Sequence, residues 1–173
     1  LQLHQRYRTL LEPMGFRPEP HARGMRFSHL MDGQQTAGRQ GRTAQPGNPQ
    51  HLSCTFLIKR ALGIEGVQSS ICSWSAPASV DSGGKKREGA QIDLVIDRRD
   101  QTINLCEMKF SMKPFEITPS YLEHIIYRRE LFRETTGTSK ALHLTFVTTY
   151  GVARNAQYGM IQSEITMDDL FKQ

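Results

Sequence analysis

The sequence predicts an α/β fold, with a mixed central sheet flanked by helices, from three observations. Two runs rich in Ile, Leu and Val follow each other closely at 91–97 and 102–110. A long segment at 118–137 then repeats apolar residues at helical spacing, and another apolar run stands at 141–149. Strands that alternate with a helix in this manner favour a sheet covered by helices.

The first 50 residues differ in composition from the rest of the chain. A short amphipathic helix is expected within 1–16, but 17–50 is rich in Gly, Gln, Arg and Pro and poor in branched apolar residues. Such a segment buries too little apolar surface to offset its ordering entropy. The sequence therefore predicts a poorly structured N-terminal segment over residues 1–50 and one compact domain over residues 51–173.

The compact domain is expected to begin with a helix at 51–62, which Gly63 ends and which turns Phe56 and Leu57 inward. A strand is predicted at 67–74. The following stretch, 75–88, is rich in Ser, Pro, Gly and Lys and predicts a charged loop. Its basic residues are Lys85, Lys86 and Arg87.

The two central apolar runs predict a β-hairpin, because only four residues separate 91–97 from 102–110. A three-residue loop at 99–101 places Asp93 opposite Glu107 on the neighbouring strand. Side chains alternate along a strand, so Glu107 and Lys109 share one face. A two-residue loop would instead turn Asp93 to the other face.

The segment 118–137 is predicted to be a helix, with Thr118 as its N-cap and proline at the first helical position. Arg128 and Arg129 are expected to lie away from its apolar face, where they either follow a phosphate backbone or form a plain solvated surface. The strand at 141–149 is followed by a loop and by a last strand at 160–166.

The hairpin carries residues suited to metal-assisted phosphodiester cleavage. Hard oxygen ligands suit magnesium, so Asp93 and Glu107 are candidate Mg²⁺ ligands, and the carbonyl of Met108 is a further one. Lys109 is positioned to orient a water molecule or to stabilise charge on the phosphate. The alternative interpretation is a solvated strand face with a cross-strand ion pair.

Asp93 followed by Glu107-Met108-Lys109 resembles the PD-(D/E)xK nuclease signature, and longer phrases add to this short motif. They are IKRALGIEGV at 58–67, SW at 73–74, GAQIDLVIDRRDQTINLCEMKFS at 89–111, ALHLTFVTTYGVARN at 141–155 and DDLF at 168–171. Together they resemble the C-terminal domain of bacterial ATP-binding proteins in which an AAA-type P-loop ATPase precedes a PD-(D/E)xK nuclease-like domain. The resemblance covers residues 51–173.

This resemblance implies a restriction-endonuclease-like core and a Mg²⁺-dependent endonuclease-like activity on DNA, in a domain attached to a P-loop ATPase. No GxxxxGK[ST] phosphate loop occurs in the sequence. PD-(D/E)xK enzymes commonly carry an acidic residue on their first core helix, but the segment Gly47–Leu57 contains no Asp or Glu. The alternative is an inactive nuclease-fold module that binds nucleic acid or protein, or regulates the attached ATPase.

Composition adds broader expectations. Lys and Arg number 22 against 17 Asp and Glu, a net charge of +5 that is compatible with DNA as a partner. The candidate phosphate contacts are Lys85, Lys86, Arg87, Arg128 and Arg129. Three cysteines without a CxxC pair predict neither a disulfide framework nor a zinc site. No apolar stretch reaches membrane-spanning length, so we expect a cytoplasmic protein without a membrane partner; a homo-oligomer remains open.

Overall fold

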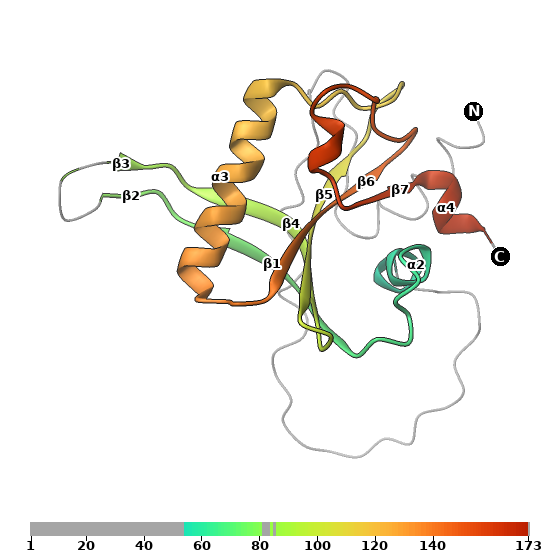
Figure 1. The fold of residues 1–173 in the computed structure, drawn as a ribbon, viewed down its shortest axis with the longest axis horizontal. Coiled ribbons are helices and arrows are strands. Elements are labelled where there is room, and N and C mark those ends of the chain that lie inside the picture. Colours follow the sequence, from blue (N-terminus) through green and yellow to red (C-terminus); the bar gives the residue numbers. More distant parts are fainter. Residues whose placement is uncertain (1–53, 81–83, 85, 173) are drawn as a thin grey trace, which may run out of the picture.

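The computed structural model describes residues 54–80, 84 and 86–172. In this part of the chain, a five-stranded mixed sheet has the strand order β1-β4-β5-β6-β7, and a separate two-stranded sheet pairs β2 with β3 (Figure 1). The fold is therefore α/β with a mixed sheet, as predicted. The segment 1–50, which the sequence predicts to be poorly structured, lies outside the described residues.

The sheet is formed by β1 (Ser69–Ala76), β4 (Ala90–Arg98), β5 (Thr102–Lys109), β6 (Ala141–Thr148) and β7 (Ser163–Thr166), while β2 (Ser79–Val80) and β3 (Lys86–Arg87) form the small ribbon. The helices are α2 (Cys54–Ala61), α3 (Pro119–Thr136) and α4 (Met167–Phe171), with a 3₁₀ turn, η2 (Tyr158–Met160). Strands β1, β4 and β5 pair antiparallel, whereas β5, β6 and β7 pair parallel.

The hairpin of β4 and β5 has the register expected from a three-residue loop. Leu94 pairs with Cys106, and the same register continues to the pair Asp97 and Ile103 next to the turn. In the turn, Gln101 adopts a φ of 66°, the left-handed conformation that closes three-residue hairpins. The predicted register is therefore confirmed over these four pairs, which end one position before Asp93 and Glu107.

Helix α3 connects the parallel strands β5 and β6. The side chain of Thr118 accepts a hydrogen bond from the amide of Tyr121, and Pro119 occupies the first helical position. At the other end, Gly137 has a φ of 64° and donates its amide to the carbonyl of Arg133. These two caps fix the helix where the sequence predicts it.

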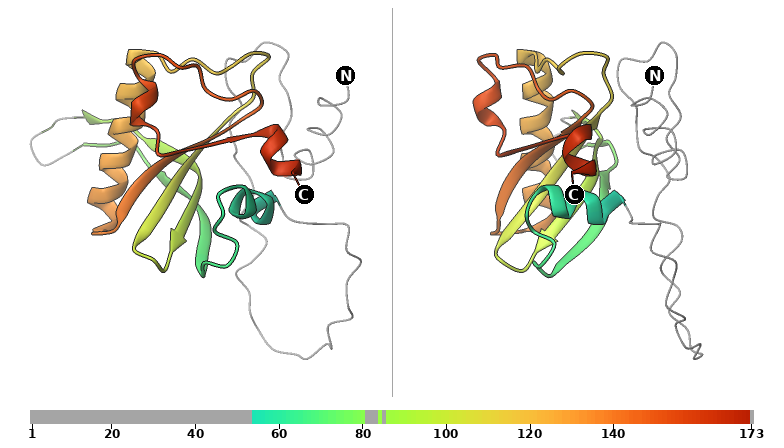
Figure 2. Two further views of the ribbon diagram at one scale, coloured as in Figure 1. Left: turned by 45° about the vertical axis from the view of Figure 1, so that its right-hand side comes forward. Right: turned by 90° about the vertical axis from the view of Figure 1, so that its right-hand side faces the viewer.

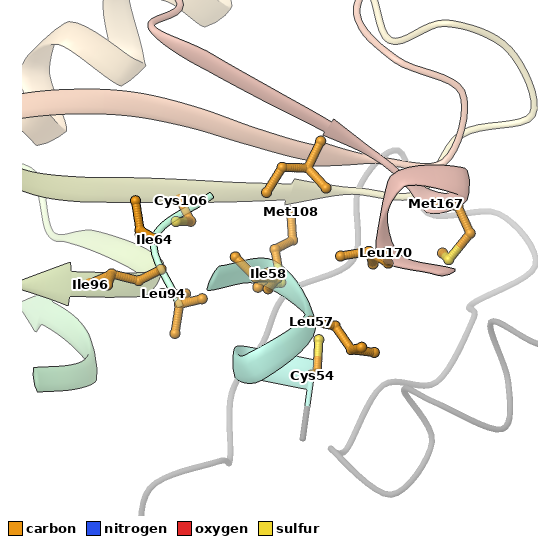
Figure 3. Close-up of a cluster of buried hydrophobic side chains, with 11 residues drawn as sticks. Cys54, Leu57, Ile58, Ile64, Leu94, Ile96, Cys106, Met108, Met167 and Leu170 are labelled. Carbon is orange, nitrogen blue, oxygen red and sulfur yellow. The ribbon is translucent and has the colours of Figure 1, made fainter. Parts of the chain in front are cut away.

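The helices cover opposite faces of the sheet. Figures 1 and 2 show α3 on one face and α2 with α4 on the other. Each face has its own buried cluster, and the cluster under α2 and α4 is drawn in Figure 3. There, Ile58 of α2 and Leu170 of α4 lie against Met108 of β5. The α2 face of the sheet is thus an apolar core.

The opposite face of β5 changes from apolar to charged along the strand. Ile103 and Leu105 belong to the buried cluster under α3. Because side chains alternate, Glu107 and Lys109 continue the same face, while Cys106 and Met108 belong to the cluster under α2. Glu107 and Lys109 therefore lie at the end of the strand, just beyond the buried apolar cluster under α3.

Several local predictions are wrong. Phe56 is 40% exposed, whereas Leu57 and Ile58 are buried, because the inward face of α2 is one residue out of phase with the predicted face. The predicted loop at 75–88 contains the ribbon of β2 and β3. The last strand begins only at Ser163, and α4 follows it without having been predicted. Within the described residues, no helix is both long and apolar enough to cross a membrane.

Candidate active site

The site begins where the regular pairing of β4 with β5 ends. The last regular pair is Leu94 with Cys106. At the next position, Oδ2 of Asp93 accepts a hydrogen bond of 3.0 Å from the backbone amide of Met108. The register of β1 against β4 also shifts beside Asp93, between Cys72 and Trp74. The β1–β4 ladder is thus irregular beside Asp93, as is common beside functional sites, and the β4–β5 pairing ends there.

A cavity of about 600 Å³ lies between this end of the sheet and α3. Asp93, Glu107 and Lys109 all line it, so the structure brings together the three residues of the predicted chemical centre. His124, Tyr127 and Arg128 of α3 form the facing wall. The cavity thus brings the carboxylates of Asp93 and Glu107 and the cations of Lys109 and Arg128 to one shared space, whose wall also includes the exposed residue Glu88.

Glu107 is buried, with 4% of its surface exposed, and its carboxylate has three side-chain partners. Its Oε1 forms an ion pair with the guanidinium of Arg128. Its Oε2 accepts a hydrogen bond of 2.9 Å from the hydroxyl of Tyr121 and lies 3.3 Å from Nζ of Lys109. A buried carboxylate needs such partners, because burial without them is strongly unfavourable.

Tyr121 connects the two cations of the site. Nζ of Lys109 lies 5.3 Å and Cζ of Arg128 lies 5.9 Å from the centroid of its ring, both within the range of cation–π attraction. Burial, and then the proximity of Glu107, raise the pKa of the Tyr121 hydroxyl above its usual range. The phenol therefore stays protonated and remains a hydrogen-bond donor to Glu107.

Asp93 is the carboxylate whose ionisation is most affected. Burial, and then the negative charge of Glu107, raise its pKa to about 6, although the Met108 amide, Lys109 and Arg128 act in the opposite direction. Ionised together, Asp93, Glu107, Lys109 and Arg128 carry no net charge. A raised carboxyl pKa in a cavity is a feature of functional sites.

The placement of Arg128 differs from the prediction. Arg128 was expected on a helix face directed away from the core, but its guanidinium reaches Glu107 inside the cavity. Tyr121, Ile125 and Arg128 are spaced four and three residues apart, which places them on one helical stripe. That spacing was the signal that could have located Arg128. Its neighbour Arg129 pairs with Glu130 at 2.9 Å instead.

Two of the other predicted phosphate contacts, Lys86 and Arg87, lie on the ribbon. Lys86 is exposed, and Arg87 forms an ion pair of 2.7 Å with Glu134 of α3. Lys85 lies outside the described residues. A second cavity, of about 450 Å³, is lined by Lys86 and Arg87 and shares three residues with the first cavity. The shared residues are Glu88, His124 and Tyr127.

Tyr127 and His124 were not predicted as site residues. The hydroxyl of Tyr127 donates a hydrogen bond of 2.7 Å to the carbonyl of Glu88, which fastens the base of the ribbon to α3. His124 lines both cavities. His124 lies three residues after Tyr121 and four before Arg128, and Tyr127 lies three residues after His124, so the helix period places these two residues together beside the Tyr121 stripe.

The oxygen atoms of the site fit a hard divalent cation in their chemistry. Magnesium is commonly bound by one or two carboxylates and completes its shell with water and substrate phosphate. Asp93 and Glu107 provide two carboxylates facing one cavity. Over residues 54–80, 84 and 86–172, no group of three or more His, Cys, Asp or Glu side chains is arranged to hold a metal. The residues therefore fit a two-carboxylate site and not a fuller protein cage.

The fold and the site define an α/β protein with paired carboxylates and paired cations at the edge of a core hairpin. No protein-family model matches the chain, and no curated protein matches it. A crystal structure of a protein of unknown function, AF1548, is similar over 66% of this chain, with 16% sequence identity and a TM-score of 0.42. The matching region spans 61% of the length of that protein.

Proposed function

We propose that this domain is a Mg²⁺-dependent phosphodiesterase that cleaves DNA, built on a restriction-endonuclease-like PD-(D/E)xK core and acting when attached to a P-loop ATPase. The observation that carries the proposal is the shared cavity of Asp93, Glu107 and Lys109. The mutual repulsion of the two carboxylates, which contributes to the raised pKa of Asp93, is what a bound cation would relieve.

In this proposal, Asp93 and Glu107 would hold the Mg²⁺ ion. When bound, the ion would neutralise the phosphate and lower the pKa of a water molecule. Lys109 holds a positive charge beside Glu107 and is 13% exposed at the cavity wall, so it can orient a water molecule or stabilise the developing negative charge on the phosphate. Tyr121 keeps Glu107 in place through its hydroxyl.

A cleavage assay with Mg²⁺ or EDTA, on single-stranded, duplex and branched DNA, tests the proposal. Asp93→Asn and Glu107→Gln should each abolish cleavage while leaving a folded protein. Asp97→Asn is the matched control, because Asp97 stands on the same strand but pairs with Lys140 and does not line the cavity. Cleavage that survives both site substitutions would contradict the proposal.

One observation favours a second candidate function. Arg128 occupies Oε1 of Glu107, so the site is charge-balanced without a metal. A site of this kind suits a nuclease-fold module that binds nucleic acid or protein, or regulates the attached ATPase, without chemistry. As a nucleic-acid-binding module, this candidate predicts DNA binding without cleavage at any Mg²⁺ concentration, and as a protein-binding or regulatory module it predicts neither. The same assay combined with a binding measurement separates these outcomes from the nuclease.

A further inference from the structure

We propose that Arg128 is an internal counter-cation of this site, which competes with a divalent metal ion for Glu107 and pairs with a substrate phosphate once it is released. Metal and phosphodiester would then bind cooperatively, and each would bind weakly alone. This inference rests on the proposed function, since it assigns a regulatory role to a residue of the same site.

The two carboxylate oxygens of Glu107 have different partners, and this difference identifies the residue that would have to move to make room for a metal ion. Tyr121 and Lys109 share Oε2, whereas Arg128 is the partner of Oε1. Exchange of a single side chain, Arg128, therefore frees one carboxylate oxygen. Tyr121 and Lys109 would keep the other oxygen in place during that exchange.

The charges of the site oppose a metal ion while Arg128 remains. Asp93 and Glu107 are already balanced by Lys109 and Arg128, so a divalent ion added among these four groups would leave a charge of about +2, with only the exposed Glu88 at the cavity wall as a further acid to offset it. The approaching ion is also repelled by both cations. If Arg128 leaves Glu107 for a phosphate, the incoming phosphate lowers the net charge and the penalty decreases.

Arg128 is the group of the site best able to make this exchange. Its side chain is 24% exposed, compared with 13% for Lys109 and 6% for Glu107. It lines the same cavity as Asp93 and Glu107, so a phosphodiester bound at these carboxylates would share that space with its guanidinium. The planar guanidinium suits phosphate as well as carboxylate, because both offer two oxygens to its fork of donors.

The experiment measures Mn²⁺ binding by titration calorimetry in the unmodified protein, in Arg128→Gln and in Arg129→Gln. Arg129 is the matched control, because it is the next residue of α3 and pairs with Glu130 outside the cavity. We expect Arg128→Gln to bind Mn²⁺ about tenfold more tightly than the unmodified protein, within the range typical of coupled sites. Arg129→Gln should bind it as the unmodified protein does.

A second titration adds dimethyl phosphate, a stable phosphodiester anion. It should strengthen Mn²⁺ binding in the unmodified protein and have a smaller effect in Arg128→Gln. Because Arg128→Gln leaves Glu107 short of a partner, a thermal melt serves as the folding control, and Mn²⁺ should raise the melting temperature of this variant more than that of the unmodified protein. Adding Glu107→Gln to Arg128→Gln should remove the gain in affinity.

Equal or weaker Mn²⁺ binding in Arg128→Gln overturns the inference, even if the unmodified protein cleaves DNA. Tighter binding in Arg128→Gln together with no cleavage by any form supports the inference and overturns the proposed nuclease. A gain in affinity that Arg129→Gln reproduces would mean that only general surface charge was removed, and it too overturns the inference.

Discussion

The carboxylate of Asp93 accepts a hydrogen bond of 3.0 Å from the backbone amide of Met108, so a side chain joins β4 to β5 where their regular pairing ends. The hydrogen bond stabilises the ionised form of Asp93, but burial and the charge of Glu107 have the larger effect and raise its pKa to about 6. The carboxylate that holds the strands together is therefore also the one that ionises with difficulty.

The contribution of Asp93 to the stability of the metal-free protein should fall as the pH rises from about 4 to about 6. The pKa of Asp93 in the folded protein is about 6, above the reference value of 3.8. Between these values the folded protein binds more protons than the unfolded chain, so the free energy of unfolding decreases as pH increases. Urea unfolding of the unmodified protein and of Asp93→Asn across this range measures the effect.

The contribution of Asp93 is the difference between these two pH profiles, since other groups titrate in both proteins. Asp93→Asn should become more stable relative to the unmodified protein as the pH rises through this window, and the difference should level off above it. Parallel profiles would show that Asp93 ionises normally. Mg²⁺, if it binds at the carboxylates, should reduce the difference between the two proteins.

Tyr121→Phe should destabilise the protein more than Tyr127→Phe, although each removes one hydroxyl from α3. The hydroxyl of Tyr121 donates to the buried carboxylate of Glu107, whereas that of Tyr127 donates to the exposed carbonyl of Glu88. Hydrogen bonds to charged groups contribute about 1.5–3 kcal/mol, and neutral ones about 0.5–1.5 kcal/mol. Urea unfolding of both variants measures the two losses, and equal losses would show that Glu107 does not depend on the Tyr121 hydroxyl.

The hairpin that carries the site could be predicted from the sequence because its physics is local. The loop between β4 and β5 is short, and the side-chain period of two then determines which residues face each other. The placement of Asp93 and Glu107 on the same face of the hairpin follows directly from these two rules. The N-cap of α3 at Thr118 is likewise a local signal and was predicted correctly, and the helix ends next to Gly137, where the predicted segment ends.

The role of Arg128 could not be obtained from those local rules alone. Its ion pair joins residues 21 positions apart on different elements, so it depends on how α3 lies on the sheet. The position predicted for Arg128 followed from its charge and not from its place on the Tyr121 stripe. Helix α4 was missed for a different reason, since its cap pairs Thr166 with Asp169, a short signal at the end of a strand.

Gly151→Ala should destabilise the protein, whereas Gly66→Ala should not. Gly151 has a φ of 84°, and an added Cβ would lie 2.6 Å from Oε1 of Glu164. That oxygen accepts the amide of Val152 at 2.8 Å, so the loop after β6 would lose its anchor as well. The left-handed conformation alone costs an alanine about 1–2 kcal/mol.

Gly66 is the matched control, because a Cβ there meets nothing within 4 Å. Alanine at this position should leave stability unchanged or raise it by up to about 1 kcal/mol through the unfolded chain. Thermal or urea unfolding of both variants makes the comparison. A Gly151→Ala protein as stable as Gly66→Ala would show that the loop after β6 can rearrange at little cost.

Lys109→Ala should separate chemistry from DNA binding. Lys109 lines the cavity beside Glu107, where it can act on the reacting phosphate, so its loss should reduce the cleavage rate by about 10²- to 10⁴-fold and change DNA affinity little. The reverse is expected when Lys85, Lys86 and Arg87 are all replaced by alanine. Affinity should then fall, and the salt dependence of binding should flatten by up to about three units, roughly one for each lost phosphate contact.

The ribbon can lose its charges with little effect on the fold, because the ion pair of Arg87 with Glu134 is exposed on both sides and such pairs contribute little stability. Lys172→Ala is the control for loss of one positive charge far from the cavity, since Lys172 pairs with Asp169 at the end of α4. Cleavage rates and binding at several salt concentrations are measured for each variant.

If Lys109→Ala and the ribbon variant weaken binding alike while the unmodified protein never cleaves DNA, the domain is a nucleic-acid-binding module. If no form binds DNA, Asp93, Glu107, Lys109 and Arg128 constitute a buried ion network that stabilises the hairpin, and regulation of an attached ATPase becomes the function to test.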